Sequence, residues 1–502
     1  MGMNQNVQTS DLTATPVGGA QDSSRLQMFV DEIEALRKET EKKIGILDAA
    51  YIKRVVGTYT ALYWASRALI IGGAWFTDPV SVVIGVFGLA VSLVIENMES
   101  GHNVMHGQYD FMNDPKINSR DYEWNIVVPS SHWKNSHNIE HHNNTNVVHR
   151  DYDFGFGHFR LSSYTKWLPV HRAQLFTFIW LAVSFQHSIG LHDARTFEYL
   201  SPPGCRPEMV QPRPGWNVFF AKMREYIGKA SRHVVRDYVF FPLLAGPYFL
   251  TVIIANLAAR GLSNIWACLV IFCGHFSEKS YVFEPKYGGP DEYIGHYYLR
   301  QIAATCNLKG NSMFHLMTGH LSYHIEHHIF PDIPAHRYPE IGERLKEICA
   351  RYDVPYLEEH MLPQLQGVMK RLIKYSSPHP KDEPLGLRFS ELLERVERTG
   401  APSPLEDRSE GEAEIAIIQG GSITCKRSGM TLNSDGSLSI LEALEDAGLE
   451  PAFGCRKGRC HTCACKKLRG RVFNTRTGLE TAGEELIQIC ISRPSGDVTL
   501  DV

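Results

Sequence analysis

Histidines are abundant in this chain, and many of them fall into three tight clusters. The chain holds 23 histidines in 502 residues. The clusters follow the spacings HxxxH, HxxxHH and HxxHH, which place imidazoles on one face of a helix. Neutral imidazole is a good ligand for iron, zinc and copper. The clustered residues are His102, His106, His137, His141, His142, His324, His327 and His328.

A ninth histidine, His275, lies near the end of a later apolar segment. It fits either a metal ligand or a structural histidine at a helix end. Nine imidazoles are too many for one four-coordinate zinc ion. They suit two metal ions with positions left open for dioxygen, so the pattern predicts a di-iron centre. No catalytic residue beyond these ligands is evident.

Four of the 11 cysteines form a second pattern. The spacing C-x4-C-x2-C followed by a distant cysteine is typical of plant-type [2Fe–2S] sites. A zinc site would usually show two CxxC pairs, and only one is present here. The other cysteines are scattered, which argues against a disulfide framework and indicates a reducing compartment. The predicted cluster ligands are Cys455, Cys460, Cys463 and Cys490.

Long apolar segments must position the histidines. Residues 57–76 and 79–95 are separated by a short turn, and each approaches the ~20 residues that cross a bilayer. Residues 239–258 and 262–277 form a second pair, with an expected turn at 259–261. The pattern predicts two transmembrane hairpins; buried core helices are the alternative. Residues 26–54 are charged and have helical spacing, so we expect a solvated or interfacial helix there.

The positions of the histidine clusters constrain the topology. If they share one metal centre, an even number of crossings separates them, so the short apolar segment 174–190 should not cross the membrane. Basic residues are scarce at the hairpin tips and common on the histidine side. The positive-inside rule therefore predicts a multi-pass protein of the inner (cytoplasmic) membrane, with its histidines and C-terminal domain in the cytoplasm. The net charge of −4 gives no reason to expect nucleic acid.

The order of the histidine clusters across two hairpins resembles that of the integral-membrane fatty-acid desaturases. The stretches IENMESGHNVMHGQYDFMNDP, SHWKNSHNIEHHNNTN, VIFCGHF and LSYHIEHHIFPDIPAHRYPEI are similar to bacterial acyl-CoA Δ9-type members, over roughly residues 25–375. The resemblance implies that the clustered histidines and His275 bind two irons. Many relatives have Gln in place of His324, which here matches the stearoyl-CoA type. His320 replaces a common Asn, so it could support the ligands or be one, and we leave it out of the predicted ligand set.

The C-terminal region, about residues 412–502, resembles a β-grasp ferredoxin domain, especially those fused to oxygenase reductases. Strands are expected at 415–418, 423–425, 470–474 and 497–502, and a Ser-capped helix at 439–447. The predicted organisation is a disordered N-terminus (1–25), a membrane desaturase domain (26–375), a linker (376–411) and an α+β ferredoxin domain (412–502). The desaturase domain should be mostly α, with four transmembrane helices in two hairpins and a cytoplasmic helical cap.

These features predict O2-dependent desaturation of a long-chain acyl-CoA or acyl-lipid, with position 9 favoured. The [2Fe–2S] domain should deliver the electrons. No Rossmann glycine fingerprint is evident, so a separate NAD(P)H-dependent flavoprotein reductase is expected to load it. The alternatives are a membrane di-iron hydroxylase of lipids or alkanes, and a non-enzymatic membrane-anchored ferredoxin. Basic residues that would meet a CoA or lipid phosphate, or merely flank the membrane, are Lys222, Arg224, Lys229, Arg232 and Arg236.

Overall fold

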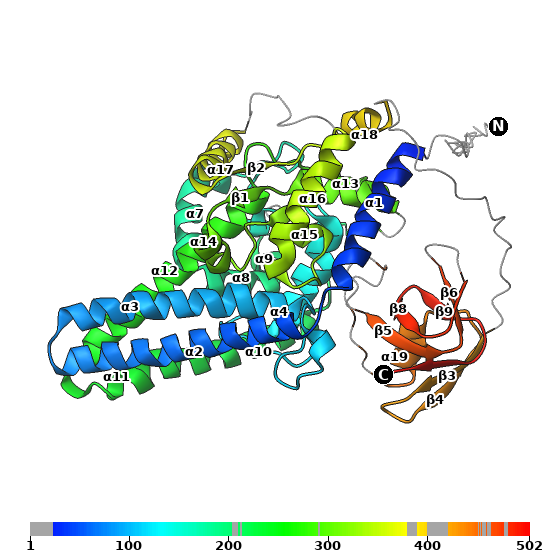
Figure 1. Cartoon of the computed structure of the whole chain (residues 1–502). Helices are drawn as coiled ribbons and strands as arrows, with labels where there is room; N and C mark the ends of the chain where they lie inside the picture. Colours follow the sequence, from blue (N-terminus) through cyan, green and yellow to red (C-terminus); the bar gives the residue numbers. More distant parts are fainter. Residues whose placement is uncertain are drawn as a thin grey trace, which may run out of the picture.

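The structure is a computed structural model, which describes residues 24–202, 209–210, 213–289, 292–378, 389–398, 420–449, 451, 453, 458, 463–475 and 480–502. Over these residues the chain is helical up to residue 398 and strand-rich from residue 420 onward (Figure 1). The mostly helical domain and the strand-rich C-terminal domain agree with the predicted fold class.

Long helices form one elongated bundle in the helical part (Figure 1). The first hairpin joins α2 (Ile46–Trp75) to α3 (Pro79–Val94), which η1 (Ile95–His102) extends. Asp78 caps α3 by accepting a hydrogen bond from the Val80 amide at 3.0 Å. Pro79 occupies the first turn of α3, where its missing N–H costs nothing. Local chemistry thus defines the turn that the sequence predicts.

The predicted second hairpin, 239–258 followed by 262–277 with a turn at 259–261, is wrong: a second hairpin forms, but with other arms and another turn. Helix α12 (Phe249–His275) continues through those residues. The preceding arm consists of α10 (Trp216–Val235), η7 (Arg236–Phe240) and α11 (Phe241–Leu243). The turn lies at residues 244–248, because Gly246, with a φ of 54°, and Pro247 interrupt the helix there.

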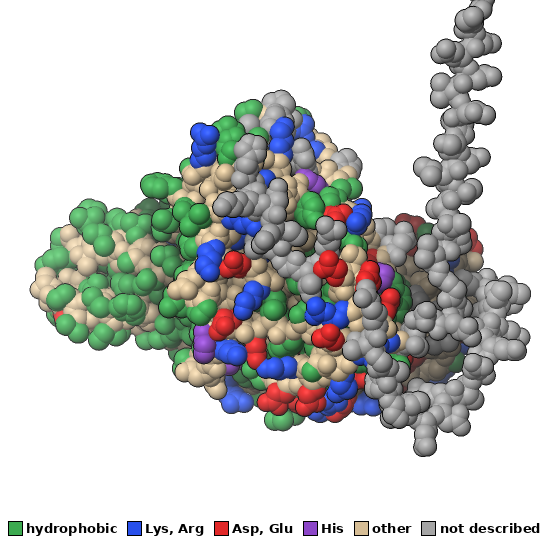
Figure 2. All heavy atoms as spheres, turned by 90° about the horizontal axis from the view of Figure 1, so that it is seen from above, with side chains coloured by type: hydrophobic (Ala, Val, Ile, Leu, Met, Phe, Trp, Pro, Cys, Tyr) green, Lys and Arg blue, Asp and Glu red, His purple; other side chains and the backbone are tan. Residues whose placement is uncertain are grey.

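On the face that Figure 2 shows, the free end of the bundle carries mainly hydrophobic and uncharged side chains. In Figure 2 it is the mainly green projection, whereas charged side chains gather on the rest of the visible face. Two helices among the described residues, Pro79–Met105 and Gly246–His275, are long and apolar enough to cross a membrane. These two spans are the membrane signal that the structure itself carries.

The segment 174–190 divides into two short helices, α7 (Gln174–Val183) and α8 (Phe185–Asp193), separated at Ser184. A helix of 10 residues is far shorter than the roughly 20 needed to span a bilayer. Large apolar side chains of α7 are nevertheless exposed, Phe176 and Trp180 among them. The geometry agrees with the prediction that this segment does not cross.

The N-terminal helix is not solvated, in contrast to the prediction for residues 26–54. Helix α1 (Ser24–Glu41) packs against α13 (Ile294–Ala304) and α16 (Tyr338–Arg351), and its Phe29 and Ile33 are fully buried. Helix α18 (Phe389–Arg398) buries Phe389 and Leu392 in the same core, so part of the predicted linker is docked. The charges of α1 hid an apolar stripe that the neighbouring helices cover.

Shorter elements complete the helical part of the chain. Strands β1 (Asn307–Lys309) and β2 (Glu358–His360) pair in parallel. The remaining helices are α4 (Asn103–Met105), η2 (Asp110–Met112), α5 (Ser130–Trp133), η3 (Lys134–His141), α6 (His142–Asn144), η4 (Phe154–Gly157), η5 (Pro169–Ala173), α9 (Thr196–Leu200), η8 (Gly246–Tyr248), α14 (Ser312–Met317), α15 (His324–Ile329), η9 (Ala335–Arg337) and α17 (Met361–Ser376).

The C-terminal part contains two sheets, in the orders β4-β3-β10-β5-β8 and β7-β6-β9. β3 and β10 are parallel, and α19 (Ile440–Asp446) begins at Ser439 in a full capping box with Glu442. These elements confirm the expected helix and three of the strands; 415–418 lies outside the described residues. The strands are β3 (Gly421–Cys425), β4 (Thr431–Ser434), β5 (Ala464–Arg469), β6 (Arg471–Asn474), β7 (Glu480–Ala482), β8 (Glu485–Gln488), β9 (Ser492–Pro494) and β10 (Val498–Leu500).

Candidate metal centres

The fold brings the nine predicted histidines together from four separate segments of the chain. In the first cluster, His102 is the last residue of η1 and His106 follows α4. The second cluster lies on η3 and α6, and the third lies on α15. His275 is the last residue of α12. Ligand atoms fall within 4.8 Å of one another in three overlapping groups: His102, His106, His137 and His327; His141, His275 and His328; His142, His327 and His328. His324 Nε2 adds to the second group, 2.8 Å from His275 Nε2.

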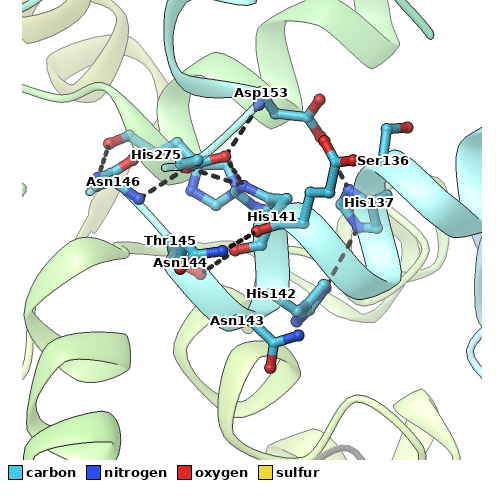
Figure 3. Close-up of polar contacts among 12 residues, drawn as sticks. Ser136, His137, His141, His142, Asn143, Asn144, Thr145, Asn146, Asp153 and His275 are labelled. Atoms are coloured by element: carbon cyan, nitrogen blue, oxygen red, sulfur yellow. Dashed lines mark hydrogen bonds and ion pairs between the residues drawn. The ribbon is translucent and has the colours of Figure 1, made fainter. Parts of the chain in front are cut away.

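Two π-helices carry the first two clusters. η1 (Ile95–His102) and η3 (Lys134–His141) are each eight residues long. π-Helical turns are rare and occur frequently at functional sites. The wider turn changes which side chains face inward, and His137 and His142 meet with their Nε2 atoms 3.3 Å apart (Figure 3). The HxxxH spacings therefore position their histidines on π-helices, which the sequence does not reveal.

The histidine nitrogens fit metal ions by their chemistry. Several are buried without a hydrogen-bond partner among the described residues: His106 Nε2, His141 Nε2, His142 Nδ1, His275 Nδ1, both nitrogens of His327, and His328 Nε2. An unsatisfied buried polar atom costs ~1–3 kcal/mol, so this many of them indicates a missing ligand. Burial lowers the pKa of His137 to about 4 and of His324 to about 3. These two imidazoles are therefore neutral, which is the form that binds metals, whereas the Asp151 carboxylate outweighs burial and raises the pKa of His141.

Two aspartates orient histidines of the second cluster, and the sequence reasoning missed both. Asp151 lies 2.9 Å from His141 Nδ1 and also accepts the Asn146 amide at 2.8 Å. Asp153 approaches His137 Nδ1 at 3.4 Å and His192 Nε2 at 3.1 Å. Figure 3 shows Asp153 above the histidines of η3. Metal-binding histidines commonly donate their second nitrogen to a carboxylate, so the pair Asp151 and Asp153 that follows the second cluster was a signal in the sequence, although only the fold shows which histidine each one meets.

His328 and His320 have different surroundings. Thr145 Oγ1 and Gln301 Oε1 lie 3.2 and 3.1 Å from His328 Nδ1, which leaves its Nε2 for a metal. His320 lies outside the three groups above; its Nδ1 is 2.8 Å from Glu99 Oε2, and Tyr51 donates to the other oxygen of Glu99 at 2.7 Å. The geometry agrees with leaving His320 out of the ligand set.

A cavity adjoins the histidines and extends along the bundle. Its walls come from α3–η1, α8 and α12, together with Trp124, Ile126 and Trp133. Most of the side chains between the helices are apolar. The lining includes Leu93, Met98, His102, His137, His141, Phe156, Phe185, Ile189, Ala267, Ile271, His275, Phe276, Leu321, His324 and His327. The metal site therefore opens into a largely apolar space.

The predicted iron–sulfur ligands are only partly visible. Cys463 and Cys490 are buried in the C-terminal core, and their sulfurs lie 3.0 Å apart. The Gly458 amide donates to Cys490 Sγ at 3.3 Å, from a residue with a φ of 66° that favours glycine. Cys455 and Cys460 lie outside the described residues. The described half of the site has two cysteines side by side and an amide directed at sulfur.

The basic residues suggested for a phosphate group are mostly engaged inside the protein. Lys229 pairs with Glu123 and donates to the Val128 carbonyl at 2.7 Å. Arg236 pairs with Asp237 at 2.9 Å. Lys222 donates to the Asp193 carbonyl at 3.1 Å. These contacts favour a structural role for the three, whereas Arg224 and Arg232 line a surface pocket.

Comparison with known proteins decides the family. Residues 73–360 match the model of the fatty acid desaturases, and residues 423–495 match that of 2Fe-2S iron-sulfur cluster binding domains. The chain belongs to the fatty acid desaturase family. This desaturase is an oxidoreductase that uses iron as a cofactor. Its histidine groups fit a di-iron centre, and its C-terminal domain fits one [2Fe–2S] cluster.

The relatives of this desaturase agree with that assignment. An NADPH-dependent stearoyl-CoA 9-desaturase of Mycobacterium tuberculosis is 36% identical over 371 residues, which cover 70% of this chain and 80% of the relative. An NADPH oxidoreductase of the same organism is 39% identical over 83 residues, 16% of this chain and 22% of that protein. Fatty acid desaturase 3 of Bos taurus is 21% identical over 389 residues, 72% of this chain and 76% of the relative.

Proposed function

We propose that this desaturase introduces a double bond at position 9 of a long-chain acyl group carried by CoA, using O2 and electrons from its own [2Fe–2S] domain. The observation that carries the proposal is the convergence of nine histidines, eight of them buried and His137 half-buried, at a largely apolar cavity. The mycobacterial relative, named for stearoyl-CoA and position 9, supports the substrate. An acyl-lipid is the alternative carrier.

The residues that would hold two irons are His102, His106, His137, His141, His142, His275, His324, His327 and His328. A bound di-iron centre supplies the oxidant that an unactivated C–H bond requires. Asp151 and Asp153 fix the orientation of His141 and His137, which keeps the inward nitrogens aimed at the metal positions. The protein's own contribution is this fixed geometry.

The cavity would position the acyl chain and keep water away from the reaction. Its walls of Phe, Ile, Leu and Trp offer no partner to water over most of their length, so an apolar chain is the favoured occupant. Because the acyl chain would lie between packed helices, only one short stretch of its carbons would meet the histidines. The position of the double bond would follow from where the head group stops.

The C-terminal domain would act as the electron supply. A [2Fe–2S] cluster carries one electron at a time, and each desaturation consumes two, so the cluster must be reloaded between deliveries. Tethering to the desaturase domain raises its effective concentration. A separate NAD(P)H-dependent flavoprotein reductase would load the cluster, which the similarity to a mycobacterial NADPH oxidoreductase supports.

We also propose that the two hairpins cross the membrane as four helices, with the histidines and the C-terminal domain in the cytoplasm. The apolar free end of the bundle supports this topology (Figure 2). α2 carries a single charge within its apolar segment, Arg67, and Asp237 pairs with it at 2.8 Å. Pairing of this kind is what charged residues within a membrane require.

The electron-supply model is tested with Cys460→Ser in the full-length chain. The variant should lose the [2Fe–2S] spectrum and the desaturation of stearoyl-CoA, with reductase and NADPH supplied, while its histidine-bound iron stays in place. The matched control is Cys465→Ser, since Cys465 is a buried cysteine of the same domain that lies outside the cluster motif. It should keep both the spectrum and the activity.

Two results would contradict the proposal. If Cys460→Ser kept full activity with the native electron source, the C-terminal domain would not be the supply. If the wild-type chain gave a hydroxylated acyl product instead of an alkene by gas chromatography, the reaction would be hydroxylation.

A further inference from the structure

A further group of possible metal ligands lies outside the nine histidines. Asp153, His192 and Asp193 each offer one ligand atom, and these atoms lie within 4.8 Å of one another. Asp153 immediately precedes η4, whereas His192 and Asp193 are the last two residues of α8. His192 Nε2 and Asp153 Oδ1 are 3.1 Å apart. Two neighbouring ligands of one octahedral ion, each about 2.1 Å from the metal, are separated by about the same distance.

The three side chains are largely buried and are held in place by their neighbours. His192 is 3% and Asp193 is 1% exposed, and the side chain of Asp153 is 14% exposed. The Tyr152 ring stacks on the His192 ring with the centroids 4.2 Å apart, and its hydroxyl donates to the His192 carbonyl at 2.8 Å. Ser136 donates to Asp193 Oδ1 at 2.8 Å. The donor atoms are therefore fixed before any ion binds, as an effective metal site requires.

The carboxylate of Asp193 is incompletely compensated. Its Oδ2 has no hydrogen-bond partner among the described residues. Burial raises the pKa of Asp193 to about 7, and the nearby Asp153 carboxylate adds to that rise. Lys222 is a basic neighbour, but its ammonium donates to the main-chain carbonyl of Asp193 at 3.1 Å. Two carboxylates that share a buried site need a proton or a cation to compensate them.

The chemistry of this group differs from that of the histidine cluster. Two carboxylates and one imidazole make an oxygen-rich set, which suits Mn²⁺, whereas nine imidazoles suit iron. Asp153 and Asp193 both line the cavity that adjoins the histidines. The side of the group that faces the cavity would leave room for the water molecules that complete an octahedral shell.

We propose that Asp153, His192 and Asp193 bind a divalent cation of the Mn²⁺ class, in addition to the two irons of the histidine cluster. The ion would fix the end of α8 to the segment that precedes η4. Asp153 also approaches His137 Nδ1 at 3.4 Å, so the ion would hold this aspartate beside a histidine of the di-iron site. The proposal does not depend on which reaction the irons perform.

The experiment measures Mn²⁺ binding to the purified, iron-loaded and oxidised full-length chain by electron paramagnetic resonance. The wild type should bind one Mn²⁺ per chain, and the signal should show hyperfine coupling to the His192 nitrogen. Asp193→Asn keeps the size of the side chain but removes its charge, and it should weaken Mn²⁺ binding at least about 10-fold. His192→Gln should abolish the nitrogen coupling. The iron content should stay equal in all variants, which also shows that they are folded.

Glu225→Gln is the matched control. Glu225 pairs with a buried histidine, His132, at 2.8 Å, but this pair lies outside the groups of converging ligand atoms in the described part of the chain. The control should bind Mn²⁺ as tightly as the wild type. Equal Mn²⁺ affinity of the wild type and both site variants would overturn the proposal. Mn²⁺ that enters only as iron leaves would also overturn it, and a proton would then compensate Asp193.

Discussion

The helical bundle contains two buried polar clusters that differ in how their polar atoms are satisfied. In the histidine cluster, seven ring nitrogens from six histidines are buried without a partner in the described residues. In the ionic cluster, Asp237 receives contacts from Arg67, Arg236 and Arg260, and Arg67 also lies 4.0 Å from the Phe241 ring centroid. The first cluster presents many ring nitrogens to something that the protein must bind. In the second cluster the charges pair with one another, although Arg67 Nε lacks a hydrogen-bond partner among the described residues.

This difference assigns roles to residues of similar burial. An unpartnered buried nitrogen is a cost that folding alone does not repay, and a metal ion repays it. A paired buried charge is retained because removing either partner leaves the other uncompensated. Changes in the histidine cluster should therefore affect metal and activity, and changes in the ionic cluster should affect stability. The following predictions test that separation.

The largest loss of activity is expected from His327→Ala. His327 belongs to two of the three histidine groups, and neither of its ring nitrogens has a partner among the described residues. The variant should lose histidine-bound iron, and its activity should fall at least about 100-fold. Residues that only support metal ligands typically cost up to about 100-fold, so a ligand should cost at least as much. Metal analysis and product formation measure the two effects. His360→Ala, at an exposed histidine, should change neither.

The largest loss of stability is expected from Asp237→Asn. The change removes the charge shared by three arginines and should cost ~3–5 kcal/mol. Thermal unfolding in detergent measures the loss, while iron per folded molecule should stay at the wild-type level. Asp114→Asn is the control, because Asp114 meets Lys53 at the surface at 3.7 Å and should cost less than ~1 kcal/mol. Equal unfolding temperatures for the two variants would remove the distinction between the clusters.

A smaller effect on activity is expected from Asp151→Asn. In the wild type, the Asp151 carboxylate accepts hydrogen bonds from His141 Nδ1 and from the backbone N–H of Asn146. The neutral asparagine side chain cannot replace this charged acceptor. Iron affinity, measured by competition with a chelator, or activity, measured by product formation, should fall by about 10–100-fold. A wild-type affinity would show that Asp151 does not orient a ligand.

The smallest effect is expected from Thr145→Val. Its hydroxyl lies 3.2 Å from His328 Nδ1, but Gln301 reaches the same nitrogen at 3.1 Å. One partner remains, so the loss should be about 1 kcal/mol, or roughly fivefold in kcat/KM. A loss as large as that of His327→Ala would mean that Thr145 does more than hold the ring.

Spacing within the sequence was enough to single out the nine histidines that the fold brings together, although it did not reveal the π-helices that carry two of the clusters. It also predicted the first hairpin, since Asp78 and Pro79 mark its turn. It failed where long-range pairing decides the outcome. Arg260 and Gly261 suggested a turn, yet Arg260 meets Asp237 inside the bundle and α12 continues. The charges of α1 suggested a solvated helix, whereas tertiary packing covers its apolar stripe. Asp151 was overlooked because only the fold places it against His141.

The most direct test of the central claim is the iron content and Mössbauer spectrum of the purified full-length chain. The account predicts four irons per chain, two in the [2Fe–2S] cluster and two with nitrogen-rich coordination at the histidines. Two irons per chain, all belonging to the cluster, would contradict a di-iron site and leave a membrane-anchored ferredoxin.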